Sequence, residues 1–396
     1  MKNKIKILAK YYKSDLIAIR RHIHSNPELS FEEYETSKYV KEILSKNNIN
    51  YIDNIAKTGI VAIIEGKNKD SKTVALRADL DALPIIEAND VPYKSKNNGV
   101  MHACGHDVHI ACLLGAAIIL NKLKNEFDGT VKFIFQPSEE KFPGGAKIMI
   151  EEGVLENPKV DAIIALHTMP ELEVGTVGFK SGQYMASTDE LYITVNGKGG
   201  HAATPELNND PIIIASELRL EIKKYFDNNS PKEIPTVVAF GKFIADGRTN
   251  IIPDFVKLEG TLRTFNEEWR EKALKIIETI CNDICNKYGA KCDVVIAKGY
   301  PYLVNDDNIT KKAKAKAIEF LNNENVIDLN LRMTAEDFAY YSQIVPGCFF
   351  RLGISNKEKN IISNLHTNTF DVDEDAIEVG SGLMSWLALS ELSDNN

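Results

Sequence analysis

The side chains with the clearest chemical potential lie in one short stretch, from Met101 to His109, which holds three of the eight histidines and one of the six cysteines. Thiolate and imidazole groups are preferred ligands of zinc and related transition metals. Gly105 lies between Cys104 and His106 and lets the backbone turn tightly, so both side chains can point at one ion. The ordinary alternative is a polar loop with a buried cysteine. Crowding of Cys and His favours a metal site, which needs further ligands from elsewhere in the chain.

Three apolar, partly β-branched runs predict buried strands, and each is followed by groups that can bind metal or move protons. These groups are Asp79 and Asp81 after the run 73–76, Glu139 and Glu140 after the run 131–135, and His167 after the run 161–166. Helical segments between the runs predict an α/β fold with an open, mostly parallel sheet. Such sheets build their sites just beyond the carboxyl ends of their strands. A single acidic pair at a strand end is usually a solvated turn, but several in succession indicate one shared crevice.

Two local patterns predict where helices begin. Ser30 followed by Glu33 matches a capping box, so we expect a helix to open there and run to about Ser45. Asp107 is expected to cap the apolar helix that follows, over residues 108–123.

The pattern changes near Gly182, where a second arrangement begins. Residues 190–297 give the order β-α-β-β-α-β, which predicts a ferredoxin-like unit. Because this unit interrupts the first, we expect a domain made of residues 1–182 and 299–396, with residues 183–298 inserted. The antiparallel sheet of such a unit leaves an edge, and pairing of that edge across a two-fold axis predicts a homodimer.

Composition narrows the class of protein. The chain has 396 residues, 44% of them hydrophobic, and a net charge of -9, which argues against nucleic acid as a partner. No apolar stretch looks long enough to span a bilayer, and the N-terminus lacks the apolar core of a signal peptide. Six cysteines in a chain of this length do not make a disulfide scaffold, so we expect reduced thiols and a cytoplasmic location.

A set of motifs gives the chain a resemblance to a known family. The sequence carries, in order, the segments 77–84 (RADLDALP), 101–107 (MHACGHD), 136–140 (QPSEE), 167–170 (HTMP), 199–205 (GGHAATP), 249–253 (TNIIP), 335–338 (AEDF) and 365–366 (LH). Together they resemble the M20 metallopeptidase family, in its amidohydrolase branch. That branch includes hippurate hydrolases, N-acyl-amino-acid amidohydrolases, auxin-conjugate hydrolases and N-acetyldiaminopimelate deacetylases. The resemblance implies a catalytic metal-binding domain with an inserted lid or dimerisation domain.

The resemblance also implies roles for individual residues. The metal ligands implied for a site with two divalent ions are Cys104, His106, Glu140, His167 and His366. Glu139 matches the general base, His201 the lid histidine that reaches the partner subunit's active site, and Asn250 a substrate-binding position. Two departures stand out. Glu206 replaces a histidine of many relatives, and the loop after Glu140 reads Lys-Phe-Pro-Gly-Gly rather than a plain glycine run.

The chemistry expected of these residues is amide hydrolysis. Two divalent ions, Mn²⁺ or Zn²⁺ first and Co²⁺ or Ni²⁺ as alternatives, would acidify a bound water and polarise the carbonyl. Glu139 would take the proton from that water and return it to the leaving nitrogen, while Asp81 would orient a ligand. Because the net charge is negative, a substrate carboxylate needs a local donor, for which Arg263 or Asn250 is the candidate.

The expected activity is cleavage of N-acyl-L-amino acids. An N-acetyldiaminopimelate deacetylase or a dipeptidase is the alternative within enzymes, and an inactive binding or assembly protein is the alternative outside them. The presence of Glu139 together with all five implied ligands argues against the inactive protein.

Overall fold

The structure is a computed structural model that describes residues 1–393 and divides into two compact units. The first unit contains residues up to Tyr184, the segment Val304–Leu331, and the chain from Asp337 onward. The second contains Met185–Leu303 and Arg332–Glu336. Strands β7 (Gly182–Met185) and β14 (Leu303–Asn305) lie where the chain passes between the units.

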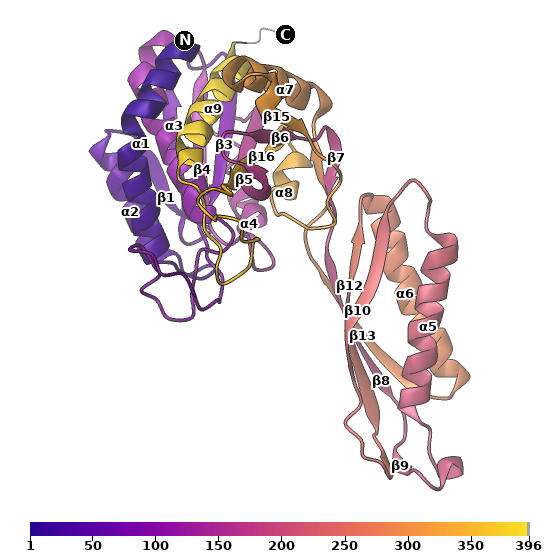
Figure 1. Ribbon diagram of the computed structural model, residues 1–396. Coiled ribbons are helices and arrows are strands. Elements are labelled where there is room, and N and C mark those ends of the chain that lie inside the picture. The colour runs from indigo at the N-terminus through magenta and orange to yellow at the C-terminus, as the bar shows by residue number, and fades with distance from the viewer. Residues whose placement is uncertain (394–396) are drawn as a thin grey trace. The chain divides into compact units, whose positions relative to one another are not determined.

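The first unit is built on an eight-stranded sheet with the strand order β1-β2-β4-β3-β5-β16-β6-β15 (Figure 1). Strands β4, β3, β5 and β16 run parallel at its centre, while β1, β2 and β6 add antiparallel pairings. This mostly parallel sheet confirms the predicted α/β fold. The strands are β1 (Tyr51–Ile55), β2 (Gly59–Glu65), β3 (Thr73–Asp79), β4 (Thr130–Gln136), β5 (Ala162–Glu173), β6 (Val177–Phe179), β15 (Val326–Asp328) and β16 (Gly347–Ser355).

The central strands bring the predicted site residues to one edge of the sheet. All residues of β3 and β4 are buried, as expected for strands covered on both faces. In the register, Asp79 lies opposite Gln136 of β4, and Arg77 lies opposite Ala165 of β5. His167, two residues after Ala165, therefore lies level with Asp79, just beyond the last paired residues of β3 and β5. It does not end its strand, because β5 continues beside β16 to Glu173.

Helices cover the sheet and enclose the core of the first unit. Helices α3 and α9 pack on β3 and β5, and α1 packs against both helices (Figure 1). The helices are α1 (Lys2–Ser25), α2 (Tyr34–Lys46), α3 (His106–Leu123), α4 (Gly145–Glu151), α7 (Asp307–Leu321), α8 (Ala339–Ser342) and α9 (Asp375–Leu392), with short 3₁₀ turns η1 (Lys124–Glu126) and η3 (Asn323–Asn325).

Both predicted helix caps are wrong. Helix α2 begins at Tyr34, and Glu33, at its N-cap position, makes no side-chain cap hydrogen bond. Glu28 caps this helix instead, because its carboxylate accepts hydrogen bonds from the backbone N–H groups of Glu35 and Thr36. The side chains of Ser30 and Glu33 turn into the protein, where tertiary partners outcompete the local cap.

Helix α2 begins later than predicted, whereas helix α3 begins earlier, at His106. Its N-cap is Gly105, with φ of 87°, a conformation that favours glycine. Asp107 lies inside the first turn, and its carboxylate accepts a hydrogen bond from Arg20 Nε of α1 at 2.6 Å. Both side chains are fully buried, so a tertiary ion pair takes the place of the predicted cap.

The prediction that no stretch is long enough to span a bilayer is wrong. Residues His106–Glu126 are long and apolar enough to cross a membrane. In the structure, however, 89% of the most apolar 18-residue part of this segment is buried inside the protein. Its apolar character on all sides is explained by packing between the sheet and helices α1 and α9.

The second unit has the predicted ferredoxin-like order. Its four-stranded antiparallel sheet runs β10-β12-β8-β13, and α5 and α6 pack on that sheet around a separate apolar core. Asp210 and Asn266 cap the two helices through side-chain oxygens. The elements are β8 (Asp189–Asn196), β9 (Gly200–His201), η2 (Pro205–Leu207), α5 (Pro211–Asn229), β10 (Thr236–Ile244), β11 (Ile251–Ile252), β12 (Phe255–Thr264), α6 (Glu267–Lys287) and β13 (Lys291–Lys298).

Candidate active site

The five residues predicted as metal ligands come together in the first unit. Their ligand atoms form two groups, each within 4.8 Å: Cys104, His106 and His167 in one, and Cys104, Glu140 and His366 in the other. Cys104 Sγ lies 3.4 Å from His167 Nε2, and Glu140 Oε1 lies 3.2 Å from His366 Nε2. Cys104 belongs to both groups, so its thiolate would help to hold an ion in either of them.

Two of the histidines are oriented by backbone carbonyl groups. The Nδ1 atom of His106 lies 2.8 Å from the Asp81 carbonyl oxygen, and Nδ1 of His167 lies 2.7 Å from the Thr168 carbonyl oxygen. A carbonyl oxygen only accepts, so each Nδ1 carries a proton, and in the neutral ring each Nε2 keeps its lone pair. This is the arrangement in which metal-binding histidines are usually held.

Two features of the His106 and Cys104 side chains fit a cation at this place. Among the described residues, His106 Nε2 is buried without a hydrogen-bond partner. It lies 3.9 Å from Glu140 Oε1, too far for a hydrogen bond. Burial raises the pKa of the Cys104 thiol, so a thiolate there needs a cation to stabilise it. The donor set of thiolate, imidazole and carboxylate therefore fits divalent transition metals.

His109, the third histidine of the opening stretch, has a supporting position. Its Nδ1 atom lies 2.6 Å from Asp79 Oδ1, and its Nε2 atom accepts a hydrogen bond from the Thr168 backbone N–H at 2.9 Å. Both ring nitrogens are therefore used within the protein, and burial lowers the pKa of the ring. His109 ties helix α3 to strands β3 and β5 and has no nitrogen left for a metal.

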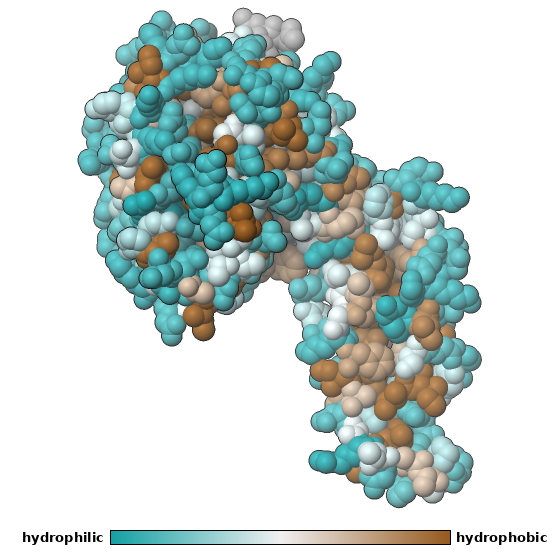
Figure 2. Space-filling model, viewed as in Figure 1, coloured by the Kyte–Doolittle hydropathy of each residue, from teal (hydrophilic) through white to brown (hydrophobic). Residues whose placement is uncertain are grey.

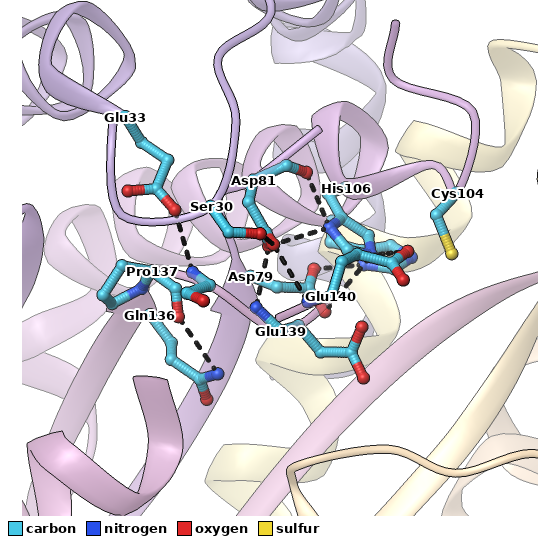
Figure 3. A network of polar contacts seen from close by, with 12 residues as sticks. Ser30, Glu33, Asp79, Asp81, Cys104, His106, Gln136, Pro137, Glu139 and Glu140 are labelled. Atoms are coloured by element: carbon cyan, nitrogen blue, oxygen red, sulfur yellow. Dashed lines mark hydrogen bonds and ion pairs between the residues drawn. The ribbon is translucent and has the colours of Figure 1, made fainter. Parts of the chain in front are cut away.

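The Asp81 carboxylate holds the backbone of the two adjacent glutamates (Figure 3). Its Oδ1 atom accepts a hydrogen bond from the Glu139 N–H, and its Oδ2 atom accepts one from the Glu140 N–H, both at 2.9 Å. Ser30 Oγ donates to the same Oδ2 at 2.6 Å. Burial alone would raise the pKa of Asp81, but hydrogen bonds from His106 and Ser30 lower it, so Asp81 stays ionised.

Glu139 and Glu140 lie in the loop between β4 and α4, residues 137–144, and project from this loop toward the histidines. A carboxylate oxygen of each lies within 4.8 Å of the other and of a His106 ring nitrogen. Glu139 is 7% exposed. One carboxylate can therefore bind an ion while its neighbour remains beside it to move a proton.

A buried network fixes the ends of β3 and β4 next to this loop. Arg77 donates to Gln136 Oε1, Asp79 Oδ2 and Asp337 Oδ1 at 2.7 to 2.9 Å. Asp337 also accepts a hydrogen bond from the Ala146 backbone N–H at 3.0 Å. The Asp337 carboxylate therefore joins segments that are far apart in the chain.

The predicted substrate-binding residues belong to the second unit. His201 lies in β9, which pairs with β11, and the Ala202 N–H donates to the Asn250 carbonyl oxygen at 3.1 Å. The structure therefore brings His201 and Asn250 side by side, both exposed. Arg263 lies on β12, where burial lowers its pKa and, within the described residues, its Nη1 atom has no hydrogen-bond partner.

Three supporting residues were not predicted from the sequence. Ser30 donates a hydrogen bond to Asp81, and Glu33 accepts one from the Ser138 N–H. Thr168 donates its backbone N–H to His109 and its hydroxyl to the Cys104 carbonyl oxygen. The spacing of Ser30 and Glu33 imitates a capping box, so the local pattern gave a misleading signal.

Comparison with known proteins decides the family. The model of peptidase family M20/M25/M40 matches residues 75–390. This chain belongs to the M20 family. It is 40% identical over 377 residues to thermostable carboxypeptidase 2 of Saccharolobus solfataricus, covering 94% of both chains. It is 38% identical over 381 residues to the N-acetyl-L-cysteine deacetylase of Bacillus subtilis, covering 96% of this chain and 89% of the relative.

A solved M20 structure supports the same assignment. The YXEP protein of Bacillus subtilis, described as a dinuclear metal binding peptidase, superposes with a TM-score of 0.81 at 35% identity, over 97% of this chain and 99% of the other. The predicted membership of the amidohydrolase branch is confirmed, and this M20 protein is a hydrolase that acts on amide bonds.

Proposed function

We propose that this M20 protein hydrolyses the amide bond of N-acyl-L-amino acids and releases a carboxylate and a free amino acid. The observation that carries the proposal is the sharing of Cys104 between two ligand groups with the carboxylate of Glu139 beside them. In this proposal residues 1–182 and 299–396 form the catalytic domain, and residues 183–298 form the lid.

Two divalent cations, Mn²⁺ or Zn²⁺ first and Co²⁺ or Ni²⁺ as alternatives, would be held by Cys104, His106, Glu140, His167 and His366. When bound, such ions polarise an amide carbonyl and lower the pKa of water. Glu139 acts as the general base: its carboxylate takes a proton from the attacking water and returns it to the leaving nitrogen. Asp81 holds Glu139 and Glu140 by their backbone N–H groups, so neither must reorganise during the reaction.

Substrate recognition is assigned to the second unit. His201 and Asn250 would contact the scissile group, His201 from the partner subunit of a homodimer. Arg263, whose Nη1 atom is buried without a hydrogen-bond partner among the described residues, would bind the substrate carboxylate. Figure 2 shows apolar surface on this unit, and its sheet exposes Val237, Phe243, Phe255 and Val295, which supports dimerisation there. A cytoplasmic location is supported by the six cysteines, all of them free thiols.

A peptide substrate is the second candidate, because one relative with 40% identity is named a carboxypeptidase. A dipeptidase, or a deacetylase of N-acetyldiaminopimelate, would use the same ligands and base. The three substrate classes differ only in the groups on either side of the amide.

Turnover of a matched panel separates these substrates. The purified protein, loaded with Mn²⁺ or Zn²⁺, is given N-acetyl- and N-benzoyl-amino acids, N-acetyldiaminopimelate and dipeptides, and the released amine is measured. We expect the highest kcat/KM on an N-acyl-amino acid. A higher value on dipeptides or on N-acetyldiaminopimelate would replace the proposal with that activity.

The base role has its own test. Glu139→Gln keeps the shape of the side chain but cannot accept a proton, so we expect unchanged metal content and a loss of kcat of roughly 100- to 10,000-fold. Glu156→Gln, on a loop beyond α4, is the control and should leave kcat unchanged. Wild-type kcat in Glu139→Gln would refute the role.

A further inference from the structure

Besides Asp81, a second buried carboxylate contacts the loop that carries Glu139 and Glu140. The proposed reaction does not use this second carboxylate. Glu33, between α1 and α2, has 0% of its surface exposed. Its Oε1 atom accepts hydrogen bonds from the Phe31 and Ser138 N–H groups at 2.9 Å, and its Oε2 atom accepts one from Thr58 Oγ1 at 2.7 Å. Figure 3 shows Glu33 reaching this loop from the opposite side to His106.

Glu33 and Asp81 divide the loop backbone between them. The N–H of Ser138 donates to Glu33, and the next two N–H groups, of Glu139 and Glu140, donate to Asp81. Ser138 has φ of 49°, a left-handed conformation that is costly for a residue with a side chain. Such a conformation persists only where surrounding contacts impose it, and the bond to Glu33 is one such contact.

The electrostatics make a purely space-filling role for Glu33 costly. Burial, and then the negative charge of Asp81, raise the pKa of Glu33 to about 7. An apolar side chain would avoid this penalty but could not accept the three hydrogen bonds. A carboxyl group at this place is therefore explained by the donors that it holds.

We infer that Glu33 is a positioning residue, which fixes the Ser138 backbone and through it the direction in which Glu139 and Glu140 project. The structural part of this inference stands by itself, and its kinetic part rests on the proposed function. A misplacement of about 1 Å at a reacting group can reduce a rate by roughly 100-fold. Removal of Glu33 should therefore reduce kcat without removing any group that touches the substrate.

Three variants and a matched control test the inference. Glu33→Ala removes the acceptors, and Glu33→Gln keeps an oxygen for the Ser138 and Phe31 N–H groups. Glu33→Asp is one methylene shorter and serves the same comparison if the alanine variant does not fold. Glu28→Ala is the control, because Glu28 also accepts two backbone N–H groups and one hydroxyl, of Glu35 and Thr36, but does not touch the loop.

The first measurement needs no activity. Hydrogen exchange of the peptide containing residues 138–140 should be faster by roughly tenfold or more in Glu33→Ala, and close to wild type in Glu33→Gln and Glu28→Ala. Exchange in Glu33→Ala equal to that in Glu28→Ala would overturn the inference.

The second measurement is kinetic and uses the metal-loaded protein with its best N-acyl substrate. We expect kcat to fall by roughly 10- to 100-fold in Glu33→Ala with KM almost unchanged, to recover in Glu33→Gln, and to stay near wild type in Glu28→Ala. An equal loss of kcat in Glu33→Ala and Glu28→Ala would show a general stability effect and overturn the inference. If wild type cleaves none of the substrates but the exchange difference is present, the proposed function fails and the positioning of the loop stands.

Discussion

Replacement of Asp81 by asparagine tests how much the loop depends on one carboxylate. The two oxygens of Asp81 accept the N–H groups of two consecutive residues, one oxygen for each. Asparagine offers one oxygen and one NH₂ group. In either orientation of the amide, the N–H of Glu139 or of Glu140 faces a donor and loses its acceptor.

The size of the effect follows from that single lost contact. A hydrogen bond to a charged group contributes about 1.5–3 kcal/mol, so the free energy of unfolding should fall by about 2 kcal/mol. If the transition state loses the same amount of stabilisation because the loop is less well ordered, kcat/KM decreases roughly 30-fold. This lies within the 10- to 100-fold range expected when a residue that supports metal ligands is changed.

The assay combines urea unfolding of the metal-free protein with steady-state kinetics of the metal-loaded protein. Asp161→Asn is the matched control, because Asp161 accepts one backbone N–H, from Thr73, at the opposite end of β3. Asparagine can still accept that bond, so the free energy of unfolding should change by less than about 0.5 kcal/mol. The reasoning is refuted if Asp81→Asn is as stable and as active as Asp161→Asn.

Two further changes test the frame and the metal site. Arg20→Leu should lower the free energy of unfolding by about 3–5 kcal/mol, because the buried Asp107 loses its partner. Arg21→Leu is the control and should lower it by less than about 1 kcal/mol, because Arg21 is half-exposed. Equal effects of the two changes in urea unfolding would contradict this prediction. Cys104→Ala should lower the metal content after dialysis, since Cys104 belongs to both ligand groups, and unchanged metal content would rule out ligation by its sulfur.

Much of the fold could be predicted because its signals are local. Buried strands such as β3 and β4 appear as apolar runs, and the alternation of strands with helices is typical of a parallel sheet. The short strands β1, β6 and β15 were missed, since three to five residues carry little periodicity. The helix starts at Tyr34 and His106 were misplaced because long-range contacts prevailed over local caps.

The sequence by itself determined the chemical inventory of this M20 protein: a cysteine, histidines and paired glutamates after successive strands, in an order specific enough to predict the family. Only the tertiary structure decided how these groups are held. It shows which nitrogen of each histidine faces the ligand cluster, and that Asp81 and Glu33 share the amides of one loop. Glu33 and Ser138 are 105 residues apart. The hydrogen bond between them depends on sheet register and helix packing, which bring distant segments together and which no local spacing encodes.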